Sequence, residues 1–124
     1  MRTIDPVVPM LRSLGLNPSD ATRLAHTGTL VELGPGVEMV TKGTRGLEAF
    51  LLVEGEAIVQ LDDRDVRVGP GAVIGETATL DPFARRNATV TTATACLALV
   101  YDVRTFRSLA TSGLHDLLVP DRAA

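Results

Sequence analysis

Turn sequences at short, regular intervals are the feature that most limits how this chain can fold. Between residues 29 and 74, short runs rich in Val, Leu and Ile are separated by turns that contain Gly, Pro or Asp. Val66 and Val68 alternate with Asp65 and Arg67, which is the pattern of a strand with one solvated face. Short strands at this spacing predict an antiparallel barrel or jelly roll.

The predicted fold is mainly β, an eight-stranded antiparallel β-roll with short helices at both ends. Most of the strands precede Gly75, and the last two follow a less regular segment. The predicted strands are residues 29–33, 37–41, 47–53, 56–61, 64–68, 72–74, 88–94 and 96–101.

Helical patterns flank the predicted strands on both sides. Residues 9–14 form a short helix or turn, and a second helix follows Asn17, whose side chain can cap it while Pro18 suits its first position. After the last strand, a helix at 103–110 places Phe106 and Leu109 on one face, toward the roll. We expect one domain over residues 1–124, with an N-terminal helical segment at 9–28, the roll at about 29–102, and a C-terminal helix and tail at 103–124.

The composition is that of a globular protein with an aliphatic core. Hydrophobic residues make up 45% of the chain, but aromatic residues only 3%, and there is no Trp. No apolar run approaches the ~20 residues of a membrane span, and the first residues do not resemble a signal peptide, so we expect no membrane association and a cytoplasmic protein. The single cysteine, Cys96, lies in a predicted strand and is expected to be a small core residue.

Charge and residue usage argue against several classes of function. The net charge is −3, and no cluster of Lys or Arg appears beyond Arg85 and Arg86, so we expect no nucleic-acid partner. The histidines, His26 and His115, stand near opposite ends, which predicts no metal site. No Ser-His or Cys-His pair and no second carboxylate beside Glu76 suggests a catalytic set, so we expect no enzymatic activity.

The segment from Gly75 to Val90 combines glycine, short-helix and charge signals. Gly75 permits a close backbone approach, residues 76–80 can form a short helix, and Pro82 ends it. The first amides of such a helix have no intrahelical partner and attract anions. Two arginines, Arg85 and Arg86, follow a few residues later.

Strand parity separates these two arginines. Ala88 and Val90 are apolar and should face the core, which places Arg86 on the inward side and Arg85 on the outward side. A guanidinium inside a roll is costly unless an anion meets it. The residues alone do not decide which anion meets Arg86. Glu76 could form a structural ion pair with Arg86, or a bound ligand could take that place.

The same segment resembles the phosphate-binding cassette of the cyclic nucleotide-binding domain family. The matching motifs are Gly75-Glu76-Thr77-Ala78 and Arg86-Asn87-Ala88-Thr89-Val90, and the resemblance extends over about residues 9–110. It implies that Arg86 pairs with the cyclic phosphate, that Glu76 accepts from the ribose 2′-hydroxyl, and that amides around Gly75 and Ala78 complete the cradle. Thr77, Asn87 and Ala88 complete the predicted ligand-binding residues, and Asn87 by itself does not decide which base is preferred.

The implied function is that of a sensor. The resemblance predicts a regulatory domain that binds cAMP, or cGMP, needs no cofactor, and signals to an unidentified effector protein in trans; it also leaves a homodimer open. Family members that regulate transcription continue into a long helix and a DNA-reading module, whereas only residues 114–119 precede Pro120 here, so we expect no effector in this chain. The alternative is a degenerate domain that docks proteins without binding nucleotide.

Overall fold

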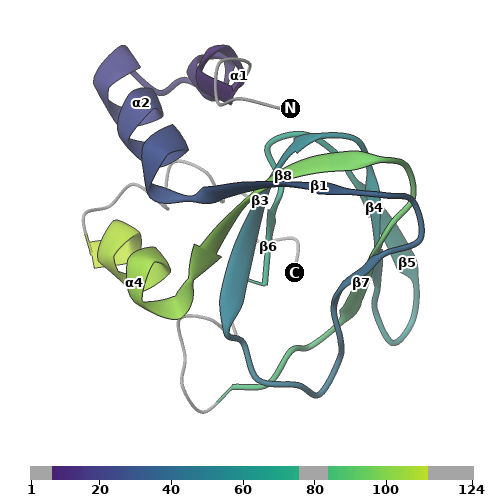
Figure 1. Ribbon diagram of the computed structural model, residues 1–124. Coiled ribbons are helices and arrows are strands. Elements are labelled where there is room, and N and C mark those ends of the chain that lie inside the picture. Colours follow the sequence, from purple (N-terminus) through teal and green to yellow (C-terminus); the bar gives the residue numbers. More distant parts are fainter. Residues whose placement is uncertain (1–6, 76–83, 112–124) are drawn as a thin grey trace.

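Two antiparallel sheets of four strands each face one another in the computed structural model, which describes residues 7–75 and 84–111 (Figure 1). One sheet has the order β1-β8-β3-β6 and the other the order β2-β7-β4-β5. The predicted eight-stranded roll is therefore confirmed. The strands are β1 (Thr29–Leu33), β2 (Glu38–Val40), β3 (Glu48–Glu54), β4 (Ala57–Gln60), β5 (Asp65–Val68), β6 (Val73–Ile74), β7 (Thr89–Thr92) and β8 (Cys96–Asp102).

Three helices in the described part of the chain lie on one side of the roll: α1 (Val7–Ser13), α2 (Pro18–Thr27) and α4 (Val103–Thr111) (Figure 1). The predicted cap of α2 is confirmed, because Asn17 Oδ1 accepts a hydrogen bond of 2.8 Å from the Asp20 amide. Asp102 caps α4 in the same way, accepting from the Thr105 amide at 2.7 Å. The predicted cassette helix after Gly75 and the tail from residue 112 lie outside the described residues. None of the described helices has the length and apolar character needed to span a membrane.

The strand ends differ from the predicted ones where a turn takes over the backbone hydrogen bonds. We predicted a strand at 88–94, but β7 ends at Thr92 because the amides of Ala93 and Thr94 both donate to the Glu56 carbonyl. We predicted a strand at 37–41, but β2 covers only Glu38–Val40, and its pairing with β7 is irregular between these two residues. The roll itself is unchanged by these differences.

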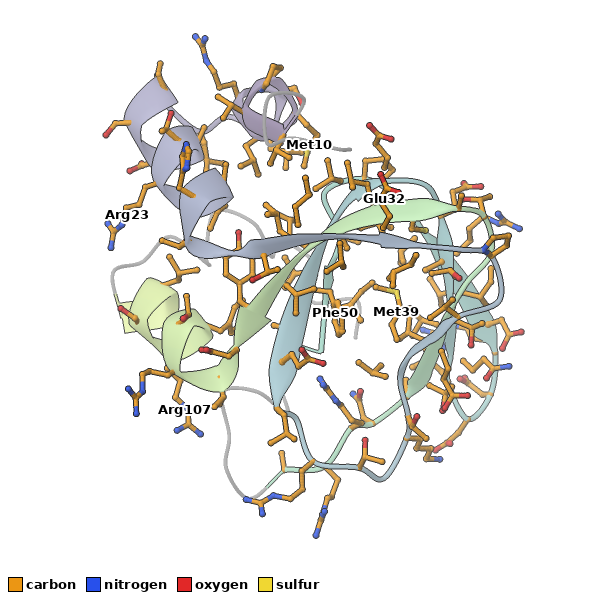
Figure 2. All side chains as sticks on the ribbon, viewed as in Figure 1. Met10, Arg23, Glu32, Met39, Phe50 and Arg107 are labelled. Carbon is orange, nitrogen blue, oxygen red and sulfur yellow. The ribbon has the colours of Figure 1, made fainter. Side chains whose placement is uncertain are left out.

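The central strands β3 and β8 of the sheet β1-β8-β3-β6 are buried on both faces. Ala49, Leu51 and Val53 of β3 pack against the helices, whereas Phe50 points between the two sheets, where Figure 2 also labels Met39. We call the first group the helix-side core: Val7, Leu11, Leu16, Ala21, Leu24, Ala25, Ala49, Leu51, Val53, Val73, Leu97, Leu99, Tyr101, Phe106 and Leu109. The second group is the roll interior: Val40, Phe50, Ala57, Val59, Ile74, Ala88 and Val90.

Tyr101 connects three elements within the helix-side core. Its side chain is buried, and its hydroxyl donates a hydrogen bond of 2.7 Å to the carbonyl of Leu24, near the end of α2. Its ring lies beside Phe106 of α4, with 6.4 Å between the ring centroids. Burial raises the pKa of the Tyr101 phenol well above its usual range. Tyr101 thus connects the strand β8 to both α2 and α4.

Gly55 is required by the close approach of two chain segments. Its φ is +91°, and a Cβ atom there would lie 2.3 Å from the Ala95 carbonyl oxygen and 2.8 Å from Cys96 Sγ. Cys96 is buried with a free thiol, as predicted for a small core residue. The hairpin between β3 and β4 can therefore pack against the start of β8 only with glycine at position 55.

The Tyr101 hydroxyl should give stability that depends on pH. At neutral pH, the free energy of unfolding of Tyr101→Phe should be about 1 kcal/mol lower than that of the wild type, because the Leu24 carbonyl loses a hydrogen-bond donor. Above about pH 10 this advantage of the wild type should shrink, since the unfolded tyrosine ionises there while the folded phenol, with its raised pKa, stays neutral. Urea unfolding of both proteins across this range measures the difference. A difference that stays constant with pH would contradict the prediction.

A glycine series separates backbone strain from steric overlap. Gly55→Ala should reduce the free energy of unfolding by about 2–3 kcal/mol, because it combines a positive φ with the overlap at Ala95. Gly36→Ala should cost about 1 kcal/mol, since its φ is +79° but no atom lies within 4 Å of the added Cβ. Gly34→Ala has neither problem and is the control. Equal losses for Gly55→Ala and Gly36→Ala in urea unfolding would show that the overlap does not matter.

Candidate functional site

Arg86 is a buried cation at one end of the roll. Only 7% of this residue is exposed, and its guanidinium donates to two backbone carbonyls, from Nη2 to Glu48 at 2.8 Å and from Nη1 to Gly75 at 3.2 Å. Arg85, the neighbouring residue, is exposed. The orientation predicted from strand parity is therefore confirmed for both arginines. The role of Arg86 in holding a ligand remains a prediction.

Gly75 makes room for the guanidinium. It follows β6 directly, is buried, and has a φ of +82°. A Cβ atom at this position would lie 2.1 Å from Arg86 Nη1 and 3.2 Å from the Glu48 carbonyl oxygen. The sequence predicted a close backbone approach at Gly75, and the group that approaches is the side chain of Arg86.

The main chain of Arg86 is held by the connection between β2 and β3. The Arg86 amide donates to the Thr44 carbonyl at 2.8 Å, and the Gly43 amide donates to the Arg86 carbonyl at 2.9 Å. Arg45 and Arg85 form an antiparallel bridge beside these bonds. These two segments run side by side along the lower edge of the roll in Figure 1. We call residues 43–45 and 85–86 the edge ribbon.

Burial and a nearby carboxylate act in opposite directions on Arg86. Burial lowers the pKa of the Arg86 guanidinium from its usual value, and the charge of Glu48 raises it. The group remains protonated, because arginine does not lose its proton in proteins. The ion pairs formed between described residues are Lys42–Asp62, Arg64–Asp63 and Arg67–Glu56, and none of them includes Arg86. Within the described part of the chain, the buried charge is therefore met by carbonyl dipoles.

The other predicted ligand-binding residues are only partly placed. Ala88 is 2% exposed and belongs to the roll interior, so it lies on the same side as Arg86. Asn87 is exposed. Glu76, Thr77 and Ala78 lie outside the described residues, so the pairing of Glu76 with Arg86 is neither confirmed nor contradicted. The structure therefore brings together Gly75, Arg86 and Ala88.

Sequence reasoning missed the groups that hold Arg86 in place. They are the carbonyl of Glu48 and the backbone of residues 43 and 44. Main-chain carbonyls and amides are present at every position and leave no signal in the residue types. A glycine at 43 indicates a turn, but it does not indicate which distant segment the turn will contact.

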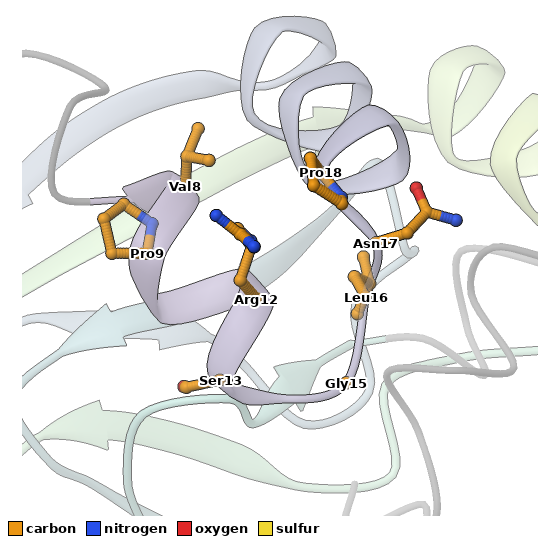
Figure 3. A pocket seen from close by; sticks show the side chains of 8 residues that line it. All are labelled: Val8, Pro9, Arg12, Ser13, Gly15, Leu16, Asn17 and Pro18. Carbon is orange, nitrogen blue, oxygen red and sulfur yellow. The ribbon is translucent and has the colours of Figure 1, made fainter.

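The cleft between α1 and α2 in Figure 3 has a volume of about 650 Å³ but does not contain this chemistry. Arg12 is its one charged lining residue, and the lining contributes no pair suited to acid–base or nucleophilic chemistry. Its lining residues are Val8, Pro9, Arg12, Ser13, Gly15, Leu16, Asn17 and Pro18. Among residues 7–75 and 84–111, no three His, Cys, Asp or Glu side chains gather as metal ligands would. Arg86 is therefore the stronger candidate.

Known proteins resemble this chain in sequence. The chain is 34% identical over 95 residues to the Pycsar effector protein PaPycTIR of Pseudomonas aeruginosa, a match that covers 76% of this chain and 31% of the relative. The chain thus spans about a third of the length of that curated relative.

Solved structures resemble the fold closely. The regulatory domain of Toxoplasma gondii PKA, crystallised with cAMP, superposes with a TM-score of 0.73 at 25% identity, covering 91% of this chain and 46% of that one. A cAMP-binding acyltransferase from Mycobacterium smegmatis gives 0.66 at 26% identity, covering 94% of this chain and 40% of the acyltransferase. The model of the cyclic nucleotide-binding domain matches residues 30–112, which include both the roll and Arg86. This chain belongs to the cyclic nucleotide-binding domain family.

Proposed function

We propose that this chain is a regulatory domain that binds cAMP, with Arg86 holding the cyclic phosphate, and that ligand binding controls an effector polypeptide. In this role the domain senses a ligand and catalyses no reaction. The observation that carries it is the buried Arg86 side chain, 7% exposed, in a segment that resembles the family's phosphate-binding cassette. A buried cation that forms no ion pair with another described residue attracts an anion.

The guanidinium has capacity left for a phosphate. Its hydrogen bonds to Glu48 and Gly75 use one N–H group on each terminal nitrogen, and a guanidinium carries further donors. Arginine binds phosphate oxygens through two parallel hydrogen bonds, and such charge-assisted bonds are stronger than neutral ones. The apolar roll interior beside Arg86 reduces competition from water.

The same contacts suggest how binding changes the protein. Arg86 joins the end of β6, through Gly75, to the first residue of β3, through Glu48. A phosphate that draws on the guanidinium alters both contacts. Because β3 and β8 also carry the helix-side core, a shift at this end of β3 reaches α4 and α2 through packed side chains. The effector reads that shift. The relative PaPycTIR is named an effector, which supports this role.

The second candidate is a protein-docking module that binds no nucleotide. One observation favours it: the Arg86 guanidinium donates to two main-chain carbonyls, and a structural arginine would be held in the same way. The two candidates differ in one measurable property, which is the effect of a cyclic nucleotide on stability.

Titration with cyclic nucleotides should separate the two candidates. At a concentration 100 times its dissociation constant, cAMP should stabilise the domain by about 2.7 kcal/mol, which thermal unfolding detects and isothermal titration confirms. cGMP, cCMP and cUMP are tested in the same way, because Asn87 does not decide which base is preferred. Linear AMP, which lacks the cyclic phosphate, is the control. If no cyclic nucleotide stabilises the domain more than AMP does, the docking module is the correct candidate.

Substitution of the two arginines tests the site itself. Arg86→Ala should lose about 1.5–3 kcal/mol of affinity for the bound nucleotide, because a charge-assisted bond to phosphate disappears. Arg86→Lys should recover little, since an ammonium cannot reproduce the planar pair of donors. Arg85→Ala, the matched control, should change affinity much less because that side chain is solvated. Circular dichroism checks that each variant is folded. A larger loss at Arg85 would refute the assignment.

A further inference from the structure

The outer surface of the edge ribbon carries two arginines directly opposite each other. Arg45 and Arg85 are partners in the antiparallel bridge, and both are exposed. Residues that face each other across two antiparallel segments have their side chains on the same side, about 4.5–5.5 Å apart at Cβ. Like charges in this arrangement repel one another and destabilise the pairing. The ribbon therefore keeps an arrangement that is unfavourable until an anion joins it.

Some surface cations of the described residues are paired with carboxylates, but Arg45 and Arg85 are not paired with any described carboxylate. Lys42, Arg64 and Arg67 each contact a carboxylate. Within residues 7–75 and 84–111, no carboxylate forms an ion pair with Arg45 or Arg85, although the chain has 15 acidic residues against 12 basic ones. Two adjacent arginines that form no ion pair within the described residues offer a local site for an external anion.

An exposed apolar side chain follows Arg45 closely in the sequence. Leu47, two residues after Arg45, is 65% exposed and is the most exposed large hydrophobic side chain of the described residues. Arginine together with an exposed apolar group is typical of protein interfaces, where guanidinium groups bind carboxylates through two hydrogen bonds.

We propose that Arg45, Arg85 and Leu47 form a docking surface for a partner polypeptide segment that carries carboxylates beside an apolar side chain. Two cations are too few for nucleic acid, which needs a larger basic footprint. They are also too few for an anionic membrane, which is bound by clusters of about 4–8 Lys or Arg. Two carboxylates and one apolar group match the number and kind of groups present.

The surface lies on the same ribbon as the buried arginine. The backbone bonds that hold Arg86 are made by Gly43 and Thr44, the residues immediately before Arg45. Arg85 faces solvent and Arg86 faces the interior, so a partner on the outer face and an anion on the inner face contact adjacent residues. Docking itself needs no nucleotide, and its failure would leave the proposed nucleotide site intact.

Fluorescence anisotropy with a labelled hexapeptide of alternating glutamate and leucine tests the docking surface. The wild-type chain should bind this peptide at low salt, and Arg45→Ala/Arg85→Ala should weaken binding about tenfold or more. The matched control is Arg12→Ala/Arg23→Ala, which removes the same charge from α1 and α2; Figure 2 labels Arg23. Its affinity for the peptide should stay within about twofold of wild type. Equal losses in the two double variants would overturn the proposal.

Other occupants are distinguished in the same experiment. Tighter binding of labelled hexathymidylate or of phosphatidylserine vesicles than of the peptide would assign the surface to nucleic acid or membrane and overturn the proposal. Self-association of the wild type in sedimentation, lost in Arg45→Ala/Arg85→Ala, would assign the surface to a second copy of this chain and overturn the proposal.

A stability measurement tests the repulsion between Arg45 and Arg85. Arg85→Gln should raise the Tm at low salt but not at about 1 M salt, where charges are screened within about 3 Å. No rise at low salt would overturn the proposal.

Discussion

Burial of the central strands β3 and β8 on both faces is the constraint on which the rest of this structure depends. Helices cover one face of their sheet and the second sheet covers the other, so neither strand has a solvated side. Residues such as Leu52 and Ala98 are fully buried, and polar groups can reach these strands only at their ends. The candidate site lies at such an end, because Glu48, whose carbonyl accepts from Arg86, is the first residue of β3.

The site is a charge placed at the edge of an apolar interior. Arg86 enters between Glu48 and Gly75, and its guanidinium donates to one main-chain oxygen in β3 and to one directly after β6. Glycine at 75 is part of the same arrangement, since any side chain there would occupy the space of the guanidinium. A buried cation that donates to main-chain carbonyls holds the surrounding segments together and remains able to attract an anion.

Alternation along one short segment gives the edge ribbon two different surfaces. Arg86 faces the interior and Arg85 faces solvent, where it lies opposite Arg45. The backbone hydrogen bonds between the two segments fix this division, because slipping the pairing by one residue would exchange the two arginines. One ribbon therefore serves the candidate ligand site on its inner side and the proposed docking surface on its outer side.

Local patterns in the sequence were sufficient for the elements and for the choice between the two arginines. Turn residues separated the strands, Asn17 and Pro18 marked the start of α2, and the apolar side chains of Ala88 and Val90 placed Arg86 inward. Each of these signals acts within a few residues, so it can be read without knowing the fold. The motif around Gly75 and Arg86 added the family in the same way.

Contacts between distant segments were decided only by the tertiary structure. The sequence alone determined that Arg86 points inward, but not that it meets the Glu48 carbonyl, that Tyr101 reaches the Leu24 carbonyl, or that Arg45 lies opposite Arg85. Main-chain carbonyls have no residue-specific signature, and register between segments is set by the packing of the whole roll. The sequence thus determined which side chain enters the site, and the fold determined which groups it meets there.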